Sequence, residues 1–213
     1  FRKLRIRFKE PYVLPTVMTC NEVKEILKYL YKLRADNPDT GGYAYKAQTR
    51  DIAVVELLFA TGIRVSELCE LSCDAVDLKQ ATIKVFGKGS KERVIQICSV
   101  EVLKILRQYQ RLFAPSKCFF INRLGNRLSS QSVRLLIKRC REEIGIGKKI
   151  TPHTFRHTFA TLLLEEDVDI KYIQNLLGHS SITTTQIYTH VNMNKQKKIL
   201  SSKHPRKKME MEE

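Results

Sequence analysis

The sequence predicts a mainly α-helical fold of the α+β class, with one small antiparallel β-sheet. Apolar residues recur at helical spacing through most of the chain, whereas residues 81–98 change to alternation around a Gly-Lys-Gly turn. The chain has 213 residues, of which 43% are hydrophobic. That length and composition can fill the core of one domain, or of two at most.

The first predicted element is an N-terminal helix. Thr19 and Glu22 form a capping-box pattern, and Val23 and Ile26 then begin an apolar repeat at helical spacing. A turn-rich loop is expected over residues 37–45, where Asn, Pro, Asp and Gly follow one another.

A second and more apolar helix is predicted from Arg50 to Ala60. Gly62 ends it, because glycine readily takes the left-handed conformation that closes many helices. A short helix follows over residues 66–71. Alternating residues over 82–86 and 91–97 then predict the two strands of a hairpin.

The second half of the chain returns to helical spacing. Its expected elements are helices over 99–113 and 130–144, a short strand over 119–122, a helix from Thr151-Pro152 to Glu166, and short helices over 169–177 and 181–192.

Charge is the strongest compositional signal. Lys and Arg number 38 against 22 Asp and Glu, a net charge of +16, which exceeds the roughly 2–8 that keeps a small domain soluble. Such an excess is typical of proteins that bind a polyphosphate, so the composition predicts a nucleic-acid partner. No apolar run approaches the ~18 residues of a membrane span.

The helix after Pro152 carries an unusual stripe. His153, Arg156 and His157 lie at i, i+3 and i+4, so they share one face of an otherwise apolar helix. A zinc site is the rival interpretation, since the two histidines have metal spacing. However, Thr154 stands where a zinc protease helix has Glu. No nearby acidic ligand or cysteine pair completes a site, and we expect no metal.

A second candidate segment for catalysis or DNA binding runs from Gly178 to Tyr188. Gly178 ends a helix, so His179 is expected in a turn, with Tyr188 on the next helix. These two residues suit either a helix-turn-helix that touches phosphates or an imidazole and a phenol that act together.

The third candidate segment follows the Gly62 stop. Arg64 there suits phosphate capture, with Glu67 three residues on to orient it, although a plain ion pair would use the same two residues. A fourth candidate, Lys88, stands at the tip of the hairpin between two glycines, which let a loop approach another backbone closely.

Taken together, these segments resemble the catalytic domain of the tyrosine recombinases, the phage-type integrases that break and rejoin DNA. The matching motifs are ATGIRVSEL, VFGKGSKER, TPHTFRHTFATLLL and LLGHSSITTTQIYTHV, within residues 14–191. The resemblance implies the catalytic fold of that family and an active site made of Arg64, Lys88, His153, Arg156, His179 and Tyr188, with Glu67 supporting Arg64.

The resemblance also implies a role for each residue. Tyr188 would attack the phosphodiester and form a 3′-phosphotyrosyl bond, with His153 as base, Lys88 as general acid and both arginines neutralising charge. His179 would donate a hydrogen bond to the phosphate. This chemistry uses no cofactor, metal or ATP, and the sequence holds no Walker-type loop.

The implied partners are double-stranded DNA and further copies of the chain, assembled as a tetramer on paired sites and joined in some systems by DNA-bending proteins. We expect a basic linker from an absent N-terminal DNA-binding domain over residues 1–14, the catalytic domain over 15–192, and a basic then acidic tail over 193–213. A cytoplasmic location, at the nucleoid when bound to DNA, is expected, with no membrane.

Two alternatives stay open on the sequence. A type IB topoisomerase-like enzyme would share the chemistry without exchanging strands. A non-enzymatic helix-turn-helix regulator would rest on residues 169–188 alone, but it leaves Arg64, Lys88 and the His153 stripe without a purpose. Integration or excision of a mobile element and resolution of DNA dimers are both compatible with these residues.

Overall fold

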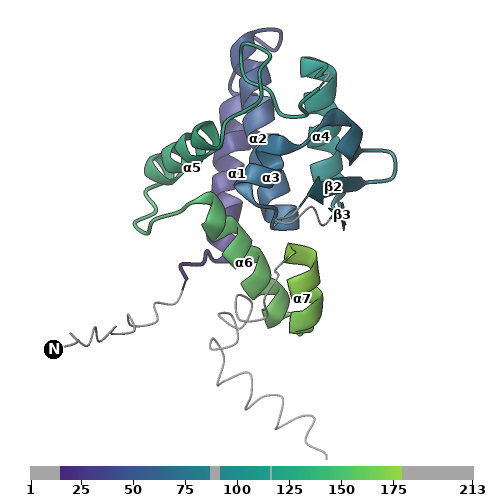
Figure 1. The fold of residues 1–213 in the computed structure, drawn as a ribbon. Helices are drawn as coiled ribbons and strands as arrows, with labels where there is room; N and C mark the ends of the chain where they lie inside the picture. The colour runs from purple at the N-terminus through teal and green to yellow at the C-terminus, as the bar shows by residue number, and fades with distance from the viewer. Residues whose placement is uncertain (1–14, 87–91, 116, 179–213) are drawn as a thin grey trace, which may run out of the picture.

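The computed structural model describes residues 15–86, 92–115 and 117–178. Its elements are α1 (Cys20–Ala35), α2 (Tyr43–Thr61), α3 (Val65–Glu70), a 3-10 turn (Cys73–Ala75), β1 (Val76–Asp77), β2 (Thr82–Phe86), β3 (Glu92–Gln96), α4 (Val100–Phe113), α5 (Ser130–Ile144), α6 (Pro152–Glu165) and α7 (Ile170–Leu177). Helices α1 and α2 lie side by side in the middle, with α5 on one side and α4 and the sheet on the other (Figure 1). Helices α6 and α7 form the lower end of the body in this view.

Helix α2 is the centre of the core. Every residue from Asp51 to Leu58 is buried, because α1, α4, α5 and α6 all pack against this helix. A helix covered on all sides needs an apolar surface all round, and the run IAVVELLF supplies it. Truncating a fully buried member such as Leu57 to Ala would cost about 2–5 kcal/mol.

The predicted helices are confirmed within the described residues, with one change of boundary. The capping box at Thr19 and Glu22 is present at the start of α1. Helix α2, however, begins at Tyr43 and not at Arg50, so its first turns occupy the end of the predicted loop. Residues 43–48 are exposed or only partly buried and include no Leu, Ile, Val or Phe, so they carry no clear apolar repeat.

The sheet contains the predicted hairpin and one strand more. β2 and β3 pair antiparallel with Val85 opposite Arg93, and residues 87–91 between them lie outside the described residues. β1 adds to the other edge of β2 through Val76 opposite Ile83. A strand of two residues is too short to show alternation, so no pattern in the sequence predicts β1.

The strand predicted over residues 119–122 is wrong. Within this segment Ile121 forms only an isolated bridge with Arg127, and Cys118, just before the segment, forms another with Ser72. The phenol of Tyr109 takes the place of a strand partner, since it donates to the Phe119 carbonyl at 2.8 Å and accepts from the Ile121 amide at 3.0 Å. Apolar residues here fill an aromatic cluster around Tyr109 and not a sheet face.

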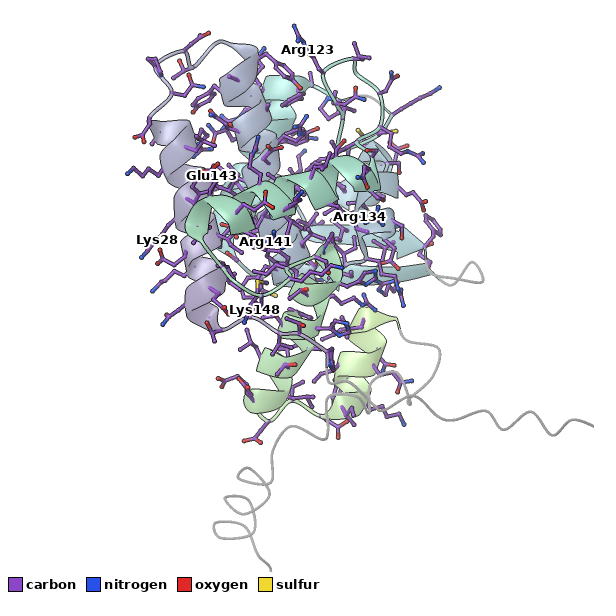
Figure 2. All side chains as sticks on the ribbon, turned by 90° about the vertical axis from the view of Figure 1, so that its left-hand side faces the viewer. Lys28, Arg123, Arg134, Arg141, Glu143 and Lys148 are labelled. Atoms are coloured by element: carbon purple, nitrogen blue, oxygen red, sulfur yellow. The ribbon has the colours of Figure 1, made fainter. Side chains whose placement is uncertain are left out.

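The segment before α1 is hydrogen-bonded to α6 and to the loop that precedes α6. The Met18 amide donates to Thr158 Oγ1 on α6 at 2.8 Å, and the Met18 side chain is buried. Lys148, in the loop before α6, donates to the Val17 carbonyl at 2.7 Å and to Glu22 at 2.6 Å. Figure 2 shows Lys148 between α5 and this N-terminal segment.

The end of the chain is described only in part. Helices α6 and α7 are where the sequence predicts them, whereas the helix predicted over 181–192 lies outside the described residues. In the portion that the structure describes, none of the helices has the length and apolar character that crossing a membrane requires.

Candidate active site

Arg64 is positioned by a tight turn between α2 and α3. Gly62 ends α2 in the left-handed conformation with φ at +59°. A Cβ at Gly62 would lie 2.6 Å from Phe159 and 2.8 Å from Leu177, so only glycine lets this turn approach α6 and α7. The turn delivers Arg64 in extended conformation to the start of α3, with its side chain about one-third exposed.

Glu67 fixes the Arg64 side chain as the sequence predicts. Its carboxylate accepts from the Arg64 backbone amide at 2.9 Å and from the Arg64 guanidinium at 2.8 Å. Burial alone would raise the pKa of Glu67, but hydrogen bonds from Arg93 and the Arg64 amide outweigh burial and hold that pKa at about 2. Glu67 is therefore a permanent anion at neutral pH.

Arg156 joins the same cluster from α6. Thr151 caps this helix and Pro152 stands in its first turn, so the chain enters α6 as the sequence predicts. Arg156 is 5% exposed and donates to the Gly62 carbonyl at 2.7 Å and to the Leu177 carbonyl at 2.6 Å. The guanidinium thus holds the Arg64 turn, α6 and α7 together.

His153 stands at the exposed N-terminal end of α6. Partial desolvation lowers the pKa of its imidazole, and the positive charges of Arg156, Arg134 and Arg64 lower it further. A lowered pKa keeps the ring neutral at pH 7, which is the form that accepts a proton. His157, one turn on, also has a lowered pKa, through desolvation and the neighbouring His153 and Arg156.

The structure thus brings together Arg64, Glu67 and Arg156, with His153 within electrostatic reach. Lys88, His179 and Tyr188 lie outside the described residues. Described residues next to His179 and Lys88 in the sequence nevertheless lie at this cluster. The carbonyl of Gly178, the residue before His179, accepts a hydrogen bond from the Arg64 guanidinium at 3.2 Å. Phe86, two residues before Lys88, lines one small cavity with Glu67.

Arg93 is a residue of this cluster that none of the sequence motifs indicated. This residue of β3 donates to both Glu67 oxygens, at 2.9 and 2.7 Å, and to the Leu176 carbonyl at 3.2 Å. The strand pattern held a usable signal. Arg93 has the same parity as the buried Ile95 and pairs with the buried Val85, so it points inward. An inward arginine requires a carboxylate partner.

A larger cavity, of about 320 Å³, lies between α2 and α5. Arg50, Asp51 and Arg139 line it together with leucine side chains, and none of the described site residues does. Among residues 15–86, 92–115 and 117–178, no group of three or more His, Cys, Asp or Glu side chains is arranged to hold a metal. The prediction of a reaction without metal remains to be tested by experiment.

Comparison with known proteins decides the family. The model of the phage integrase family matches residues 16–195, which is most of the chain. The chain belongs to the phage integrase family. The resemblance drawn from the sequence motifs is therefore confirmed, and this member of the family is a tyrosine recombinase catalytic domain.

Named relatives agree with this membership. A tyrosine recombinase of Agathobacter rectalis is 50% identical over 211 residues, covering 97% of this chain and 68% of that protein. Tyrosine recombinase XerC of Thermodesulfovibrio yellowstonii is 45% identical over 165 residues, covering 73% of this chain and 55% of that protein. This chain thus spans between 55% and 68% of the length of these two relatives.

Solved structures confirm the mainly α fold with its small antiparallel sheet. The crystal structure of XerA recombinase has a TM-score of 0.74 and 32% identity, covering 92% of this chain and 67% of that one. XerH bound to palindromic difH substrate, a post-cleavage complex, has a TM-score of 0.75 and 25% identity, covering 89% of this chain and 54% of that one. These relatives are recombinases, and they give no support to the topoisomerase or regulator alternatives.

Proposed function

We propose that this domain cuts and rejoins DNA at specific sites through a covalent link to Tyr188, as the catalytic part of a site-specific recombinase. The observation that carries the proposal is the convergence of Arg64 and Arg156 on the Gly62 turn and the end of α7, with His153 beside them. A second support is the solved XerH complex with its DNA substrate.

The arginines would lower the barrier to attack on an anionic phosphodiester. Negative charge grows on the non-bridging oxygens as the nucleophile approaches phosphorus, and cations fixed in advance stabilise that charge without reorganising. Glu67 and the backbone carbonyls fix the two guanidinium groups. Loss of one fixed donor of this kind lowers a rate by on the order of 10²–10³.

Proton transfers would complete the step. The Tyr188 phenol has an ordinary pKa near ~10 and must lose its proton to attack. His153, kept neutral by its surroundings, would accept that proton while the tyrosine oxygen bonds to phosphorus. The bond from phosphorus to the 5′-oxygen then breaks, and Lys88 would protonate the leaving oxygen. His179 would hold a non-bridging oxygen by a hydrogen bond.

The DNA would lie across the face that joins His153 to α5. Arg134 of α5 is exposed, and its charge acts on His153, so a phosphate held at the site also meets this helix. Figure 2 shows Arg134 and Arg141 along α5 on that side of the molecule. Exposed cations here would supply salt-dependent affinity. We further propose that four copies assemble on two paired sites.

The test is covalent capture. A duplex selected by the protein from a randomised library is nicked beside the cleavage position, so that the short leaving strand diffuses away and the adduct accumulates. The protein should form an adduct at Tyr188, and Tyr188→Phe should form none while binding the duplex with equal affinity. Tyr172→Phe, on the exposed side of α7, is the matched control. An adduct with Tyr188→Phe would contradict the proposal.

A further inference from the structure

Three arginines from three different elements converge on the end of α7. Each donates to one of three consecutive carbonyls: Arg93 to Leu176 at 3.2 Å, Arg156 to Leu177 at 2.6 Å and Arg64 to Gly178 at 3.2 Å. The last carbonyls of a helix have no partner within the helix and form its negative pole. Cations are therefore the natural groups to satisfy them, and here they fix the backbone directly before His179.

Arg93 is the one of these three arginines that binds the Glu67 carboxylate with both terminal nitrogens of its guanidinium. Its two terminal nitrogens hold both oxygens of Glu67, at 2.9 and 2.7 Å, in a parallel fork. Glu67 also accepts two hydrogen bonds from Arg64, so its carboxylate receives four in all. Arg93 is 13% exposed and Glu67 is 5% exposed, so water screens their interaction little.

Arg93 changes the net charge of the group that Arg64 and Glu67 form. Arg64 and Glu67 by themselves would be a neutral pair, because the carboxylate cancels the guanidinium that is to meet a phosphate. Arg93 adds one positive charge in contact with the same carboxylate. The trio then carries a net charge of +1, and Glu67 can hold Arg64 in place without cancelling its attraction for an anion.

We propose that Arg93 is a positioning residue for the recombination reaction, holding Glu67 and the end of α7 so that Arg64 keeps both its orientation and its net charge. The proposal rests on the function proposed above and deepens it. Arg93 need not touch DNA. Its place on β3, five residues after Lys88, also ties the strand that leaves the Lys88 hairpin to the cluster at Glu67.

The first test measures the rate of adduct formation at saturating protein. Arg93→Gln should lower this rate by about 10- to 100-fold, as loss of a residue that orients a functional group does, while DNA affinity stays nearly unchanged. Arg93→Lys keeps the charge but not the fork, and it should recover part of the rate. Arg107→Gln is the matched control, since Arg107 holds one backbone carbonyl, that of Leu78, away from the site.

A purely structural role for Arg93 predicts a different pattern. Arg93→Gln would then melt at a lower temperature, its rate loss would equal the fraction unfolded, and Lys would restore nothing beyond what it restores in stability. Either that pattern or an unchanged rate for Arg93→Gln would overturn the proposal. If the parent protein forms no adduct, the proposed recombination fails, and a test that does not use cleavage then decides the part played by Arg93.

That second test is a double-mutant cycle on unfolding by urea. Arg93→Gln, Glu67→Gln and the double variant are compared with the parent chain at pH 7. Because Arg93 compensates the charge of Glu67, its loss should destabilise the protein clearly less once Glu67 is already neutral. Additive losses would show that the two side chains are not coupled and would overturn the proposal, whatever the outcome of the cleavage assays.

Discussion

Two buried carboxylates in this domain are each held by two arginines, yet their pKa values shift in opposite directions. Glu67, on α3, binds Arg64 and Arg93, and its pKa is held at about 2. Asp51, between α2 and α5, binds Arg50 and Arg139, and burial raises its pKa above the ordinary value in spite of both cations.

The geometry of the hydrogen bonds explains the difference. Asp51 receives both Arg50 bonds on one oxygen, at 3.1 and 2.8 Å, and a longer bond of 3.3 Å from Arg139, which is half exposed. Glu67 receives two bonds on each oxygen, one of them from a backbone amide. The number and placement of hydrogen-bond donors, more than the count of arginines, decides in which direction the pKa of a buried acid shifts.

The comparison predicts its largest contrast in catalysis. Arg64→Gln should lower the rate of covalent cleavage by on the order of 10²–10³ with little loss of DNA affinity, because Arg64 acts on charge that develops during the reaction. Arg50→Gln, at the other carboxylate, should lower the melting temperature but leave cleavage by the folded protein within about twofold. Equal losses of rate in the two variants would break the comparison.

The second contrast concerns the free energy of unfolding at acid pH, which the two carboxylates are expected to change in opposite directions. The pKa of Glu67 falls from 4.5 to about 2 on folding, so its contribution is complete above pH 4.5 and is lost as the pH falls toward 2. That contribution amounts to roughly 3 kcal/mol. Asp51 has a raised pKa in the folded state, so its protonation stabilises the fold as the pH falls through that value.

Unfolding by urea between pH 2 and pH 7 measures these slopes. Glu67→Gln should make the loss of stability below pH 4.5 shallower, whereas Asp51→Asn should make it steeper by removing the opposing gain. If the two variants change the slope in the same direction, the opposite pKa shifts assigned to the two acids are wrong.

A smaller effect is expected at the glycines that end α7 and α5. Gly178 and Gly145 both have positive φ, +64° and +75°, so alanine at either position should cost ~1 kcal/mol through backbone strain. A Cβ at Gly178 would also lie 2.9 Å from the Arg93 guanidinium, whereas one at Gly145 meets nothing within 4 Å. Gly178→Ala should therefore destabilise by about 1 kcal/mol more.

Removing Arg93 provides the control for this difference. In an Arg93→Gln background, Gly178→Ala and Gly145→Ala should destabilise the domain equally, as measured by urea unfolding. A difference that persists would show that another neighbour of Gly178 is responsible.

Chelation of metal ions is expected to have no effect. If fixed arginine charges stabilise the transition state at this site, EDTA should leave the rate of covalent cleavage unchanged. A loss of cleavage on chelation that zinc or magnesium restores would instead favour a metal at His153 and His157, and the arginine cluster would then be a structural joint like that at Asp51.

The sequence predicted those parts of the fold that leave a periodic or local signal. The capping box at Thr19, the Gly62 stop and the Thr151-Pro152 start all mark helix ends through nearby residues alone, and each is present in the structure. The early start of α2 and the lost strand after Phe119 depend on tertiary contacts, and propensity does not encode those.

The same division holds for the site. Motifs identified Arg64, His153 and Arg156, and Glu67 follows from its spacing to Arg64. Arg93 could be found only by noticing that a cation occupies an inward position of a strand, and its partner across the fold is not visible in the sequence. The three carbonyls at the end of α7 belong to the backbone, so side-chain motifs carry no trace of them.

The hydrogen bond from the Met18 amide to Thr158 joins residues 140 apart in sequence. A ribosome makes Met18 early and Thr158 late, so the helix that bears His153 and Arg156 has its full set of contacts only when nearly the whole body has been synthesised. Closing so long a loop is also entropically costly until other contacts have formed. A nascent chain that ends before α6 lacks Arg156, and it therefore also lacks the assembled arginine cluster.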